Sequence, residues 1–521
     1  MVNLQLFKSA KQAAQLPPAL AVNAAGAPAY VLTPQHQLAQ YAATGCLNTT
    51  FYASAEAQLD TVLALCKKVE PAFIAQTAVY CRERGYMKDM PALLLAVLAG
   101  QGAAELAPVF QRVINNGKML RNFVQILRSG VVGRKSLGSR PKKLVQTWLN
   151  NASEQALLAA AVGNAPSLAD VVKMVHPKPQ QAWRAAFFAW LIGKQYDAKA
   201  LPPALAAFEA YKADPSQAMP EVPFQMLTAL TLSAADWAQI ARQGNWQMLR
   251  MNLNTFGRHG VYGIKGMPEL IAAKLGNPEA IAKARVFPYQ LMSAYMAAGD
   301  NVPAVIRDAL EQALEISLAN VPRIAGRVVV CPDVSGSMSS PVSGFRGSAT
   351  SNARCIDVAA LVAAAMLRKN PDAMVLPFEH SVVDCRLNAQ DSVMTNAAKL
   401  AAIGGGGTNC SAPLAHMNSK KTQADLVIFV SDNESWIDTK RSGATATMTQ
   451  WLSFKQRNAQ AKLVCIDISP HATTQAMECA DILNVGGFSD DVFKIIAAFA
   501  AGQLSPAHWV GEIAAIDIAV S

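Results

Sequence analysis

The chain has 521 residues, of which 52% are hydrophobic and 16% are charged, and its formal net charge is +10. This hydrophobic share excludes a disordered protein, and the length indicates roughly two to four domains, or one long repeat array with a compact module. No apolar run of about 18 residues or more lacks charges and turn formers, so we expect no membrane-spanning helix.

The opening residues show no basic segment followed by an apolar block, so we expect no secretory signal. The nine cysteines are scattered and form no C-x-x-C pair. Such usage is typical of a reducing compartment, and it predicts a cytoplasmic protein.

Positive charge is concentrated in the first part of the chain. Residues 1–325 hold 31 Lys and Arg against 19 Asp and Glu, a net charge of +12, whereas the remainder holds 15 against 17, a net charge of −2. Residues 101–150 alone carry nine basic side chains and one acid, Glu105. Such a local excess indicates a surface that binds phosphate, although cations that only solvate helix faces give the same composition.

Residues 37–320 show one helical pattern after another. Segments such as AQLDTVLALCKKV, MPALLLAVLAG and LADVVKMV repeat apolar residues at spacings of three and four. Breaks at Pro71, Gly85, Pro166 and Pro177 separate the segments. No strict sequence period is visible, so the pattern predicts a degenerate helical-repeat array, with an irregular helical domain as the alternative.

The basic segment is the first candidate for a site that binds a polyanion. The strings RSG from Arg128 and GRKSLGSRPKK from Gly133 place cations on a loop and the adjoining helix starts, where phosphate oxygens accept charge-assisted hydrogen bonds. The alternative is a solvated basic loop. We expect phosphate contacts from seven side chains: Arg121, Arg128, Arg134, Lys135, Arg140, Lys142 and Lys143.

After Val321 the pattern changes to short β-branched runs that alternate with helices. RVVVCPDVSGSM is a predicted buried strand that leads into a turn, IDVAALVAAAMLRKN is helical, and further strands are predicted in DAMVLPFEH, DLVIFVSD, KLVCIDIS and ILNVG. This order predicts a doubly wound α/β domain with a parallel sheet. We therefore expect two domains, a helical one at 1–322 and an α/β one at 323–521.

Three segments of the predicted α/β domain converge at the carboxyl ends of strands, where open parallel sheets bind ligands. They carry hydroxyls and carboxylates, which are the hard oxygen ligands that Mg²⁺ and Mn²⁺ prefer. The alternative is that the two serines cap the following helix. We expect a divalent metal, Mg²⁺ first, to be bound by Asp333, Ser335, Ser337, Thr408 and Asp432. With two anionic groups, the ion could also accept an acidic side chain from a partner.

The D-x-S-x-S, Gly-rich Thr loop and strand-end Asp resemble the metal-ion-dependent adhesion site (MIDAS) of von Willebrand factor A (vWA) domains. A helical array followed by such a domain resembles the Ro autoantigen family in its bacterial or phage form, whose helical part is the TROVE module. LAQYAATGCLNTTFYASAEAQL, CRERGYMKDMPALLLAVLA, RSGVVGRKSLGSRPKKLVQTWLN, VKMVHPKP, LNTFGRHGVY, GGGGTNCSAPL and VSDNESW are similar to family strings. The resemblance covers roughly residues 37–499.

The resemblance implies a HEAT-repeat ring with a positively charged central hole, which the vWA domain helps to close. It also implies a non-catalytic ribonucleoprotein component that binds Y-like noncoding RNA on its outer surface and single-stranded ends of misfolded RNA in the hole. We expect a monomer in RNA quality control, with an exoribonuclease tethered through RNA as a further partner.

The resemblance also adds candidate RNA-binding residues. His176 matches a histidine that the family uses near the Y RNA, and Lys173 and Lys178 flank it. The preceding LLAAAVGNAP carries none of the basic residues that the family often has there, so the footprint is reduced or displaced. Arg258 and His259 lie on a predicted turn, where they line the hole or cap a helix. Phe256 beside them is predicted to be core, with base stacking as the alternative.

Two other readings of the sequence stay open. In the first, the metal site binds an acidic protein partner and the helices are a scaffold. In the second, the Asp–Ser site performs phosphoryl transfer or hydrolysis, with Glu379-His380 as a candidate base. The chain lacks a P-loop, a G-x-S-x-G elbow and an H-E-x-x-H motif, which favours a protein that is not an enzyme.

Overall fold

The computed structural model describes residues 16–45, 49, 52–342, 353–436 and 443–519. These residues form two compact units, each built from two stretches of chain. The sheet unit contains the residues up to Gln58 together with Leu318–Gly511, and the helical unit contains Leu59–Ser317 together with the residues from Glu512 onward.

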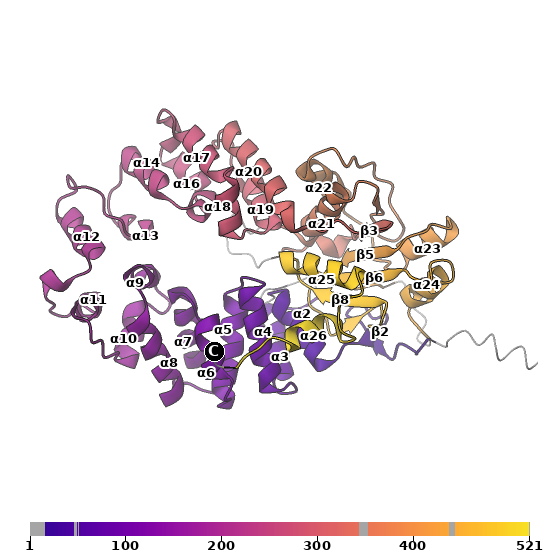
Figure 1. Ribbon diagram of the computed structural model, residues 1–521, viewed down its shortest axis with the longest axis horizontal. Coiled ribbons are helices and arrows are strands. Elements are labelled where there is room, and N and C mark those ends of the chain that lie inside the picture. Colours follow the sequence, from indigo (N-terminus) through magenta and orange to yellow (C-terminus); the bar gives the residue numbers. More distant parts are fainter. Residues whose placement is uncertain (1–15, 46–48, 50–51, 343–352, 437–442, 520–521) are drawn as a thin grey trace, which may run out of the picture. The chain divides into compact units, whose positions relative to one another are not determined.

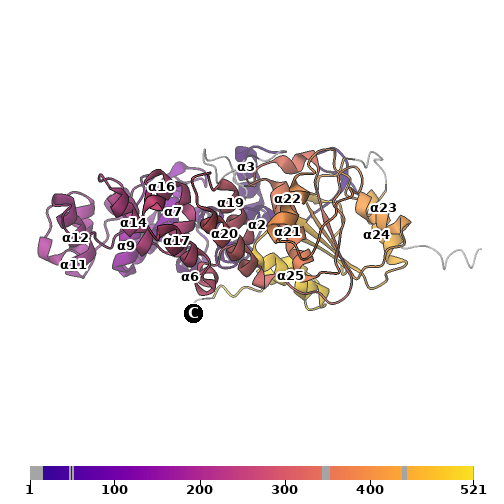
Figure 2. The same ribbon diagram turned by 90° about the horizontal axis from the view of Figure 1, so that it is seen from above.

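The helical unit is an array of short helices joined by short loops (Figures 1 and 2). Its helices are α3 (Ala55–Cys66), α4 (Pro71–Glu83), α5 (Asp89–Gln101), α6 (Leu106–Val113), α7 (Gly117–Ser129), α8 (Ser139–Asn151), α9 (Glu154–Ala161), α10 (Leu168–Val175), α11 (Ala182–Leu191), α12 (Pro203–Ala213), α13 (Phe224–Leu227), α14 (Ala234–Gln243), α15 (Trp246–Met251), α16 (Leu253–Arg258), α17 (Met267–Leu275), α18 (Pro278–Ala284), α19 (Pro288–Ala297) and α20 (Ala304–Ser317). This confirms the predicted helical array.

Local sequence explains where these helices begin. Ser167 and Ser233 each form a capping box with an aspartate three residues later, which satisfies the free N–H groups of the first turn. Pro71 and Pro278 occupy first-turn positions, where a missing N–H costs nothing. Apolar stripes then pack α4 on α5, α5 on α7 and α17 on α20. Within the described part of the chain, no helix has both the length and the apolarity to cross a bilayer.

Residues far apart in the sequence also meet within the helical unit. The guanidinium of Arg285 lies 5.5 Å from the centre of the Tyr86 ring, and Phe287 lies 5.6 Å from the same ring. Near the C-terminus, Arg112 donates a hydrogen bond to the carbonyl of Asp517 (2.6 Å). The unit is therefore held together by contacts between its early and late segments as well as between neighbours.

The sheet unit contains a five-stranded parallel sheet with helices on both faces. Its elements are β1 (Ala21–Val22), β2 (Pro28–Val31), α2 (Pro34–Ala43), β3 (Val328–Pro332), α21 (Cys355–Lys369), β4 (Met374–Val375), α22 (Val393–Ala401), α23 (Ala412–Ser419), β5 (Leu426–Ser431), α24 (Ala446–Lys455), β6 (Lys462–Asp467), β7 (Thr473–Thr474), β8 (Ile482–Gly486), α25 (Asp490–Ala500) and α26 (His508–Ala514), whose last residues enter the helical unit.

The sheet order is β4-β3-β5-β6-β8, and all neighbouring strands are parallel. Strands β3, β5 and β8 are buried along their whole length, as expected when helices cover both faces. Val427 and Phe429 of β5 point into a core cluster that includes residues of α23 and α24, whereas α21 packs against β3 and β5. The predicted doubly wound domain is confirmed.

The N-terminal segment is an integral part of the sheet unit. Strands β1, β2 and β7 form a small antiparallel sheet, and α2 packs against β8. The predicted division at 322/323 is therefore wrong for the described residues up to Gln58, which belong with the sheet, and for those after Gly511, which belong with the helices. The sequence missed this because β1 and β2 are only two and four residues long.

His36 makes the packing of α2 against β8 dependent on pH. Its Nε2–H donates to the carbonyl of Asn484 in β8 (3.1 Å), and burial lowers the pKa of His36 from 6.5 to about 4, against the opposing effect of that hydrogen bond. The folded sheet unit therefore favours the neutral form of His36. Stability from this group is present above pH 6.5 and is lost as pH falls toward 4, by up to about 3 kcal/mol.

We expect the urea concentration at the unfolding midpoint of the sheet unit to decrease as the pH is lowered from 6.5 to 4. We expect His36→Gln to remove this part of the pH dependence. Urea unfolding at a series of pH values measures it. His176→Gln, at an exposed histidine of the helical unit, is the matched control. An unchanged pH profile in His36→Gln would contradict the assignment.

Candidate functional site

The carboxyl ends of β3 and β5 lie side by side at the point where the chain order of the sheet reverses. Strand β3 has β4 on one side and β5 on the other, so the loops after β3 and β5 diverge and leave a crevice between them. Asp333 follows β3 directly, and Asp432 follows β5. The loop that carries Thr408 lies against this crevice, because the Gly336 N–H donates to the Gly406 carbonyl (3.0 Å) and the Gly405 N–H donates to the Val334 carbonyl (3.1 Å).

Three hydroxyls meet at this place. Thr408 Oγ1 donates to Ser335 Oγ (2.8 Å), and Ser335 Oγ lies 3.3 Å from Ser337 Oγ. The Ser337 hydroxyl is also hydrogen-bonded to the Asp432 carboxylate. The structure therefore brings together all five residues that the sequence predicted as a metal site.

Two carboxylates lie beside these hydroxyls and are fully buried. Asp333 accepts hydrogen bonds from the Ser335 N–H (2.9 Å) and from Ser431 Oγ (2.6 Å). Burial and then the charge of Asp432 raise the pKa of Asp333 to about 7, and burial likewise raises the pKa of Asp432. Two buried carboxylates that repel each other in this way are an arrangement that a divalent ion stabilises.

The observed spacing fits Mg²⁺. Mg²⁺ binds oxygens at about 2.0–2.1 Å in octahedral geometry, so neighbouring ligands lie about 3 Å apart. The hydroxyl separations of 2.8 and 3.3 Å agree with that value. The donor set is entirely oxygen, which excludes soft metals and suits Mg²⁺ or Mn²⁺.

The glycine loop is shaped for close packing. Gly404, Gly405 and Gly406 have φ values of 29°, 141° and 66°, which side chains rarely adopt. A Cβ on Gly407 would overlap Nε1 of Trp436, so the indole covers this part of the loop. His380 packs against the same indole edge-to-face at 5.5 Å, and its Nδ1 accepts a hydrogen bond from the Gly407 N–H (3.0 Å). Trp436, whose packing the sequence did not settle, thus forms a wall of the site.

Sequence reasoning missed a second group of buried polar side chains beside the site. Glu434 pairs with His471 Nδ1 (2.7 Å) and accepts the Ala25 N–H (3.2 Å). Burial opposes protonation of His471, but Glu434 outweighs it and raises the pKa of His471. Asp467, at the end of β6, accepts a hydrogen bond from Gln40 Nε2 (2.8 Å). These contacts involve residues from the N-terminal segment, which no local motif marks.

The predicted RNA-binding residues divide into an exposed group and a group with internal partners. Arg128 at the end of α7 and Lys173 on α10 are exposed, and both act on the carboxylate of Asp170. Gln146 of α8 donates to the Val175 carbonyl (2.5 Å), which joins α8 to the end of α10. We define the α7–α8–α10 surface by its basic side chains: Arg128, Lys142, Lys143, Lys173, His176 and Lys178. Lys135, on the α7–α8 loop, is also exposed.

Three of the predicted arginines donate hydrogen bonds to backbone carbonyls. Arg121 is 8% exposed and donates to the carbonyls of Val162 (2.6 Å) and Pro166 (3.2 Å). Arg134 donates to Ala99 (2.8 Å), and Arg140 donates to Ala103 and Ala104 (both 2.9 Å). The burial of Arg121 contradicts its expected role in phosphate contact: it ties the α9–α10 loop to α7. Arg134 ties the α7–α8 loop to the end of α5, and Arg140 ties the first turn of α8 to the α5–α6 loop.

Arg258 and His259 lie on a different group of helices. Arg258 donates to Thr255 Oγ1 one turn earlier (3.1 Å), and His259 stacks on Trp237 at 4.3 Å. Both side chains are exposed. Phe256 is fully buried, which confirms its prediction as a core residue.

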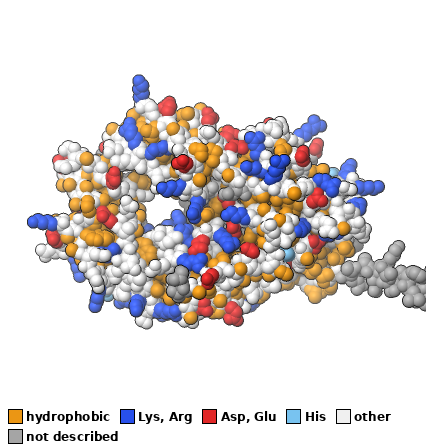
Figure 3. Space-filling view, in the orientation of Figure 1, with side chains coloured by type: hydrophobic (Ala, Val, Ile, Leu, Met, Phe, Trp, Pro, Cys, Tyr) orange, Lys and Arg blue, Asp and Glu red, His pale blue; other side chains and the backbone are white. Residues whose placement is uncertain are grey.

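A further group of cations was not predicted. Lys88 lies in the α4–α5 loop, near Lys118 and Arg82. Burial, and then the positive charges of these two residues, lower the pKa of Lys88. Arg82 bonds Asn115 Oδ1 through Nε (3.1 Å) and Nη2 (2.7 Å). Lys118 lies in the basic segment, but nothing in the sequence places it beside residues 82 and 88. Figure 3 shows Lys and Arg side chains over both units, so net charge alone does not mark an interface.

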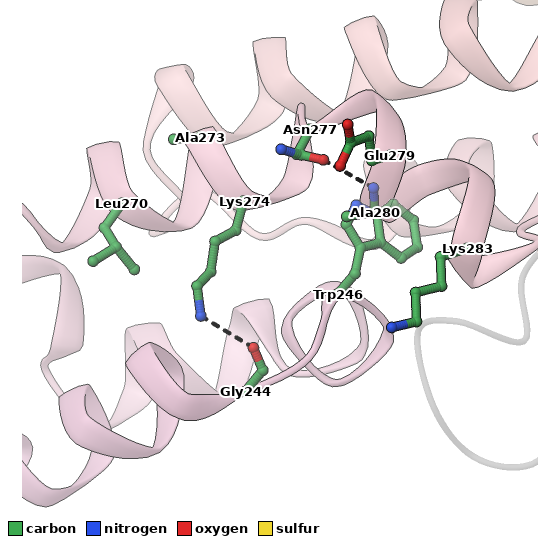
Figure 4. A pocket seen from close by; sticks show the side chains of 9 residues that line it. All are labelled: Gly244, Trp246, Leu270, Ala273, Lys274, Asn277, Glu279, Ala280 and Lys283. Carbon is green, nitrogen blue, oxygen red and sulfur yellow. Dashed lines mark hydrogen bonds between the residues drawn. The ribbon is translucent and has the colours of Figure 1, made fainter.

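The helical unit also has a cavity of about 540 Å³ near α14, α15, α17 and α18 (Figure 4). Trp246, Leu270 and Ala273 line it, and Lys274 points across it to donate to the Gly244 carbonyl (3.2 Å). Asn277 caps α18 by accepting the Ala280 N–H (2.8 Å). None of the sequence-predicted site residues lines this cavity.

Comparison with known proteins agrees with this architecture. Residues 327–500 match the family profile described as the Ro60 vWA domain. This part of the sheet unit is therefore similar to the Ro60 vWA domain, and the helical array lies outside the matched residues.

Most of the chain is similar to a bacterial protein. It is 25% identical to the RNA-binding protein RO60 of Deinococcus radiodurans, over 92% of this chain and 95% of that protein. The crystal structure of the Deinococcus radiodurans RO (RSR) protein matches 91% of this chain and 100% of that chain, with a TM-score of 0.62 and 21% sequence identity. The resemblance to the Ro family is thus borne out over most of the chain, and the fold is that of the RSR protein.

The packing of Trp436 on Gly407 gives a test of the site wall. We expect Gly407→Ala to lower stability by about 1–3 kcal/mol, because the added Cβ overlaps the indole. In a Trp436→Ala background the same substitution should cost much less, and thermal melting of the four proteins of the cycle measures the coupling. Equal costs in both backgrounds would show that the indole does not lie on Gly407.

Proposed function

We propose that the protein binds single-stranded RNA through the α7–α8–α10 surface of its helical unit. The observation that carries this proposal is the exposure of Arg128, Lys143 and Lys173 on three helices that pack together. A row of exposed cations binds phosphates without reading base identity, and each contact releases counterions. The relative named RNA-binding protein RO60 supports the same class of ligand.

The family resemblance extends this proposal to particular RNAs. We propose that a Y-like noncoding RNA binds near His176, that single-stranded ends of misfolded RNA are further ligands in a central hole, and that the protein serves RNA quality control without catalysis of its own. The ring of His176, which directly follows α10, is exposed and therefore accessible to a ligand. A tethered exoribonuclease is the further protein partner we expect.

We also propose that Asp333, Ser335, Ser337, Thr408 and Asp432 hold Mg²⁺. The three hydroxyls and two buried carboxylates supply an oxygen-only ligand set of the required spacing. When bound, the ion would neutralise the two carboxylates and offer a binding position to an anionic group. An acidic protein partner is therefore the second candidate ligand of the molecule.

The RNA proposal predicts a loss of affinity on charge reversal at the exposed cations. We expect Arg128→Glu, Lys143→Glu and Lys173→Glu together to weaken binding of a single-stranded RNA at least about tenfold, and to reduce the slope of log K against log salt by about 2. Fluorescence anisotropy at several KCl concentrations measures both quantities.

The matched control reverses three exposed lysines of the sheet unit: Lys420→Glu, Lys421→Glu and Lys494→Glu. It makes the same change in net charge, so an equal loss of affinity in both triple variants would mean that only overall charge matters. Unchanged affinity and slope in the helical variant would reject the proposed surface.

The metal proposal predicts stabilisation of the sheet unit by Mg²⁺. At a concentration about one hundred times Kd, binding should add about 2.7 kcal/mol to the free energy of unfolding, and Asp333→Asn should abolish that gain. Thermal melting with and without MgCl₂ measures it, with Asp372→Asn, at an exposed aspartate, as the control. If the wild-type melting temperature does not respond to Mg²⁺ or Mn²⁺, the proposal fails.

A further inference from the structure

The metal site has one side that is less deeply buried than the rest. Asp333 and Ser335 have no exposed surface, and Thr408 and Asp432 are each 3% exposed. Ser337 is 9% exposed, the largest value among the five. A ligand that arrives from outside therefore has its nearest access beside the Ser337 hydroxyl.

Tyr52 lies at this side. Its hydroxyl is hydrogen-bonded to the Ser337 side chain, and the carboxylates of Asp432, Glu434 and Asp333 are close enough to act on it. The Tyr52 ring meets the His471 ring edge-to-face, with 5.9 Å between ring centres. His471 is held by its ion pair with Glu434 (2.7 Å). The phenol thus lies between the candidate metal ligands and the buried His471–Glu434 pair.

Described residues between 23 and 40, earlier in the chain than Tyr52, are hydrogen-bonded to the same edge of the sheet. Asn23 Nδ2 donates to the Ser435 carbonyl (2.5 Å), and the Ala25 N–H donates to Glu434 Oε2 (3.2 Å). Gln40 of α2 donates to Asp467 at the end of β6 (2.8 Å). These bonds tie the N-terminal segment to the loops after β5 and β6, so Tyr52 is supplied to the site by the sheet unit itself.

We propose that Tyr52 is an intramolecular cap on the metal site: it covers the Ser337 side and must leave before an anionic group of a partner can reach a cation held there. The inference rests on the proposed Mg²⁺ site for its function. A phenol is a neutral oxygen ligand, so it competes weakly with a carboxylate for a divalent ion. It blocks water and weak ligands, and an acidic side chain delivered by a bound partner displaces it.

The cap itself can be tested without metal. In a Ser337→Cys background, the rate at which iodoacetamide labels the introduced thiol of the full-length, metal-free protein reports access to this side, and peptide mass spectrometry separates it from the native thiols. We expect Tyr52→Ala to raise this labelling rate about tenfold or more, because protection is lost when a covering group is removed. Tyr52→Phe, which keeps the ring on His471, should give an intermediate rate.

Tyr196→Ala, at a half-buried tyrosine of the helical unit, is the control and should leave the rate unchanged. Equal labelling rates of the introduced thiol with and without the Tyr52→Ala substitution would overturn the proposal. A rise of the same size at the buried Cys410 would also overturn it, because general loosening and not removal of a cap would then explain the labelling.

The consequence for ligands is measured with Mn²⁺ bound to the protein with Ser337 intact. Water-proton relaxation reports solvent access to the bound ion, and acetate is the carboxylate probe. At equal occupancy by Mn²⁺, Tyr52→Ala should increase the relaxation enhancement and lower the acetate concentration that reverses it, and identical titrations in the two proteins would overturn the gating role. If Mn²⁺ does not bind the wild type, the metal proposal fails, whereas the labelling experiment still decides whether Tyr52 is a cap.

Discussion

The constraint on which the site depends is the burial of two carboxylates at neighbouring strand ends. The hydrophobic register of β3 and β5 fixes where each strand stops, and Asp333 and Asp432 come at those stops because they directly follow the apolar runs. Neither aspartate can move to solvent without disturbing the sheet core. The glycine loop, the serine hydroxyls and the covering Trp436 and Tyr52 side chains are all arranged around this pair. The site is therefore a product of sheet topology before it is a product of any local motif.

The sequence was sufficient to predict the sheet and the meeting of five polar side chains at its edge, for a physical reason. Parallel strands buried on both faces leave continuous apolar runs such as VVVCP and LVIFVS, and the topology of such sheets brings their carboxyl ends together. The helical array could be predicted equally well, because an apolar stripe repeats along each helix and Pro or Gly separates one helix from the next. In both cases the information is local, and the long-range arrangement follows from general rules of packing.

The features that the sequence did not reveal depend on partners that are distant along the chain. Strand β2 pairs with β7, which follows only after Leu59–Ser317 of the helical unit, and Tyr52 needs Ser337 and His471. For the same reason, the sequence did not reveal which basic side chains are exposed. Arg121 and Lys143 look equivalent in the sequence, but Arg121 is buried against two carbonyls and Lys143 is exposed. Composition identified the basic segment, and only the structure shows which of its side chains donate hydrogen bonds to the backbone of neighbouring loops.

The sheet unit is discontinuous in the chain, and this affects how it is made. During synthesis, strand β2 and helix α2 emerge long before β7 and β8, with Leu59–Ser317 of the helical unit between them. At about 5–20 residues per second, the first segment waits on the order of 20 seconds or more for the strands that it will join. Over that interval its apolar side chains, among them Tyr30 and Leu38, have no native surface to cover. The completed sheet unit can form only near the end of translation, so a prematurely terminated chain would retain the helices of Leu59–Ser317 and lack a complete sheet unit.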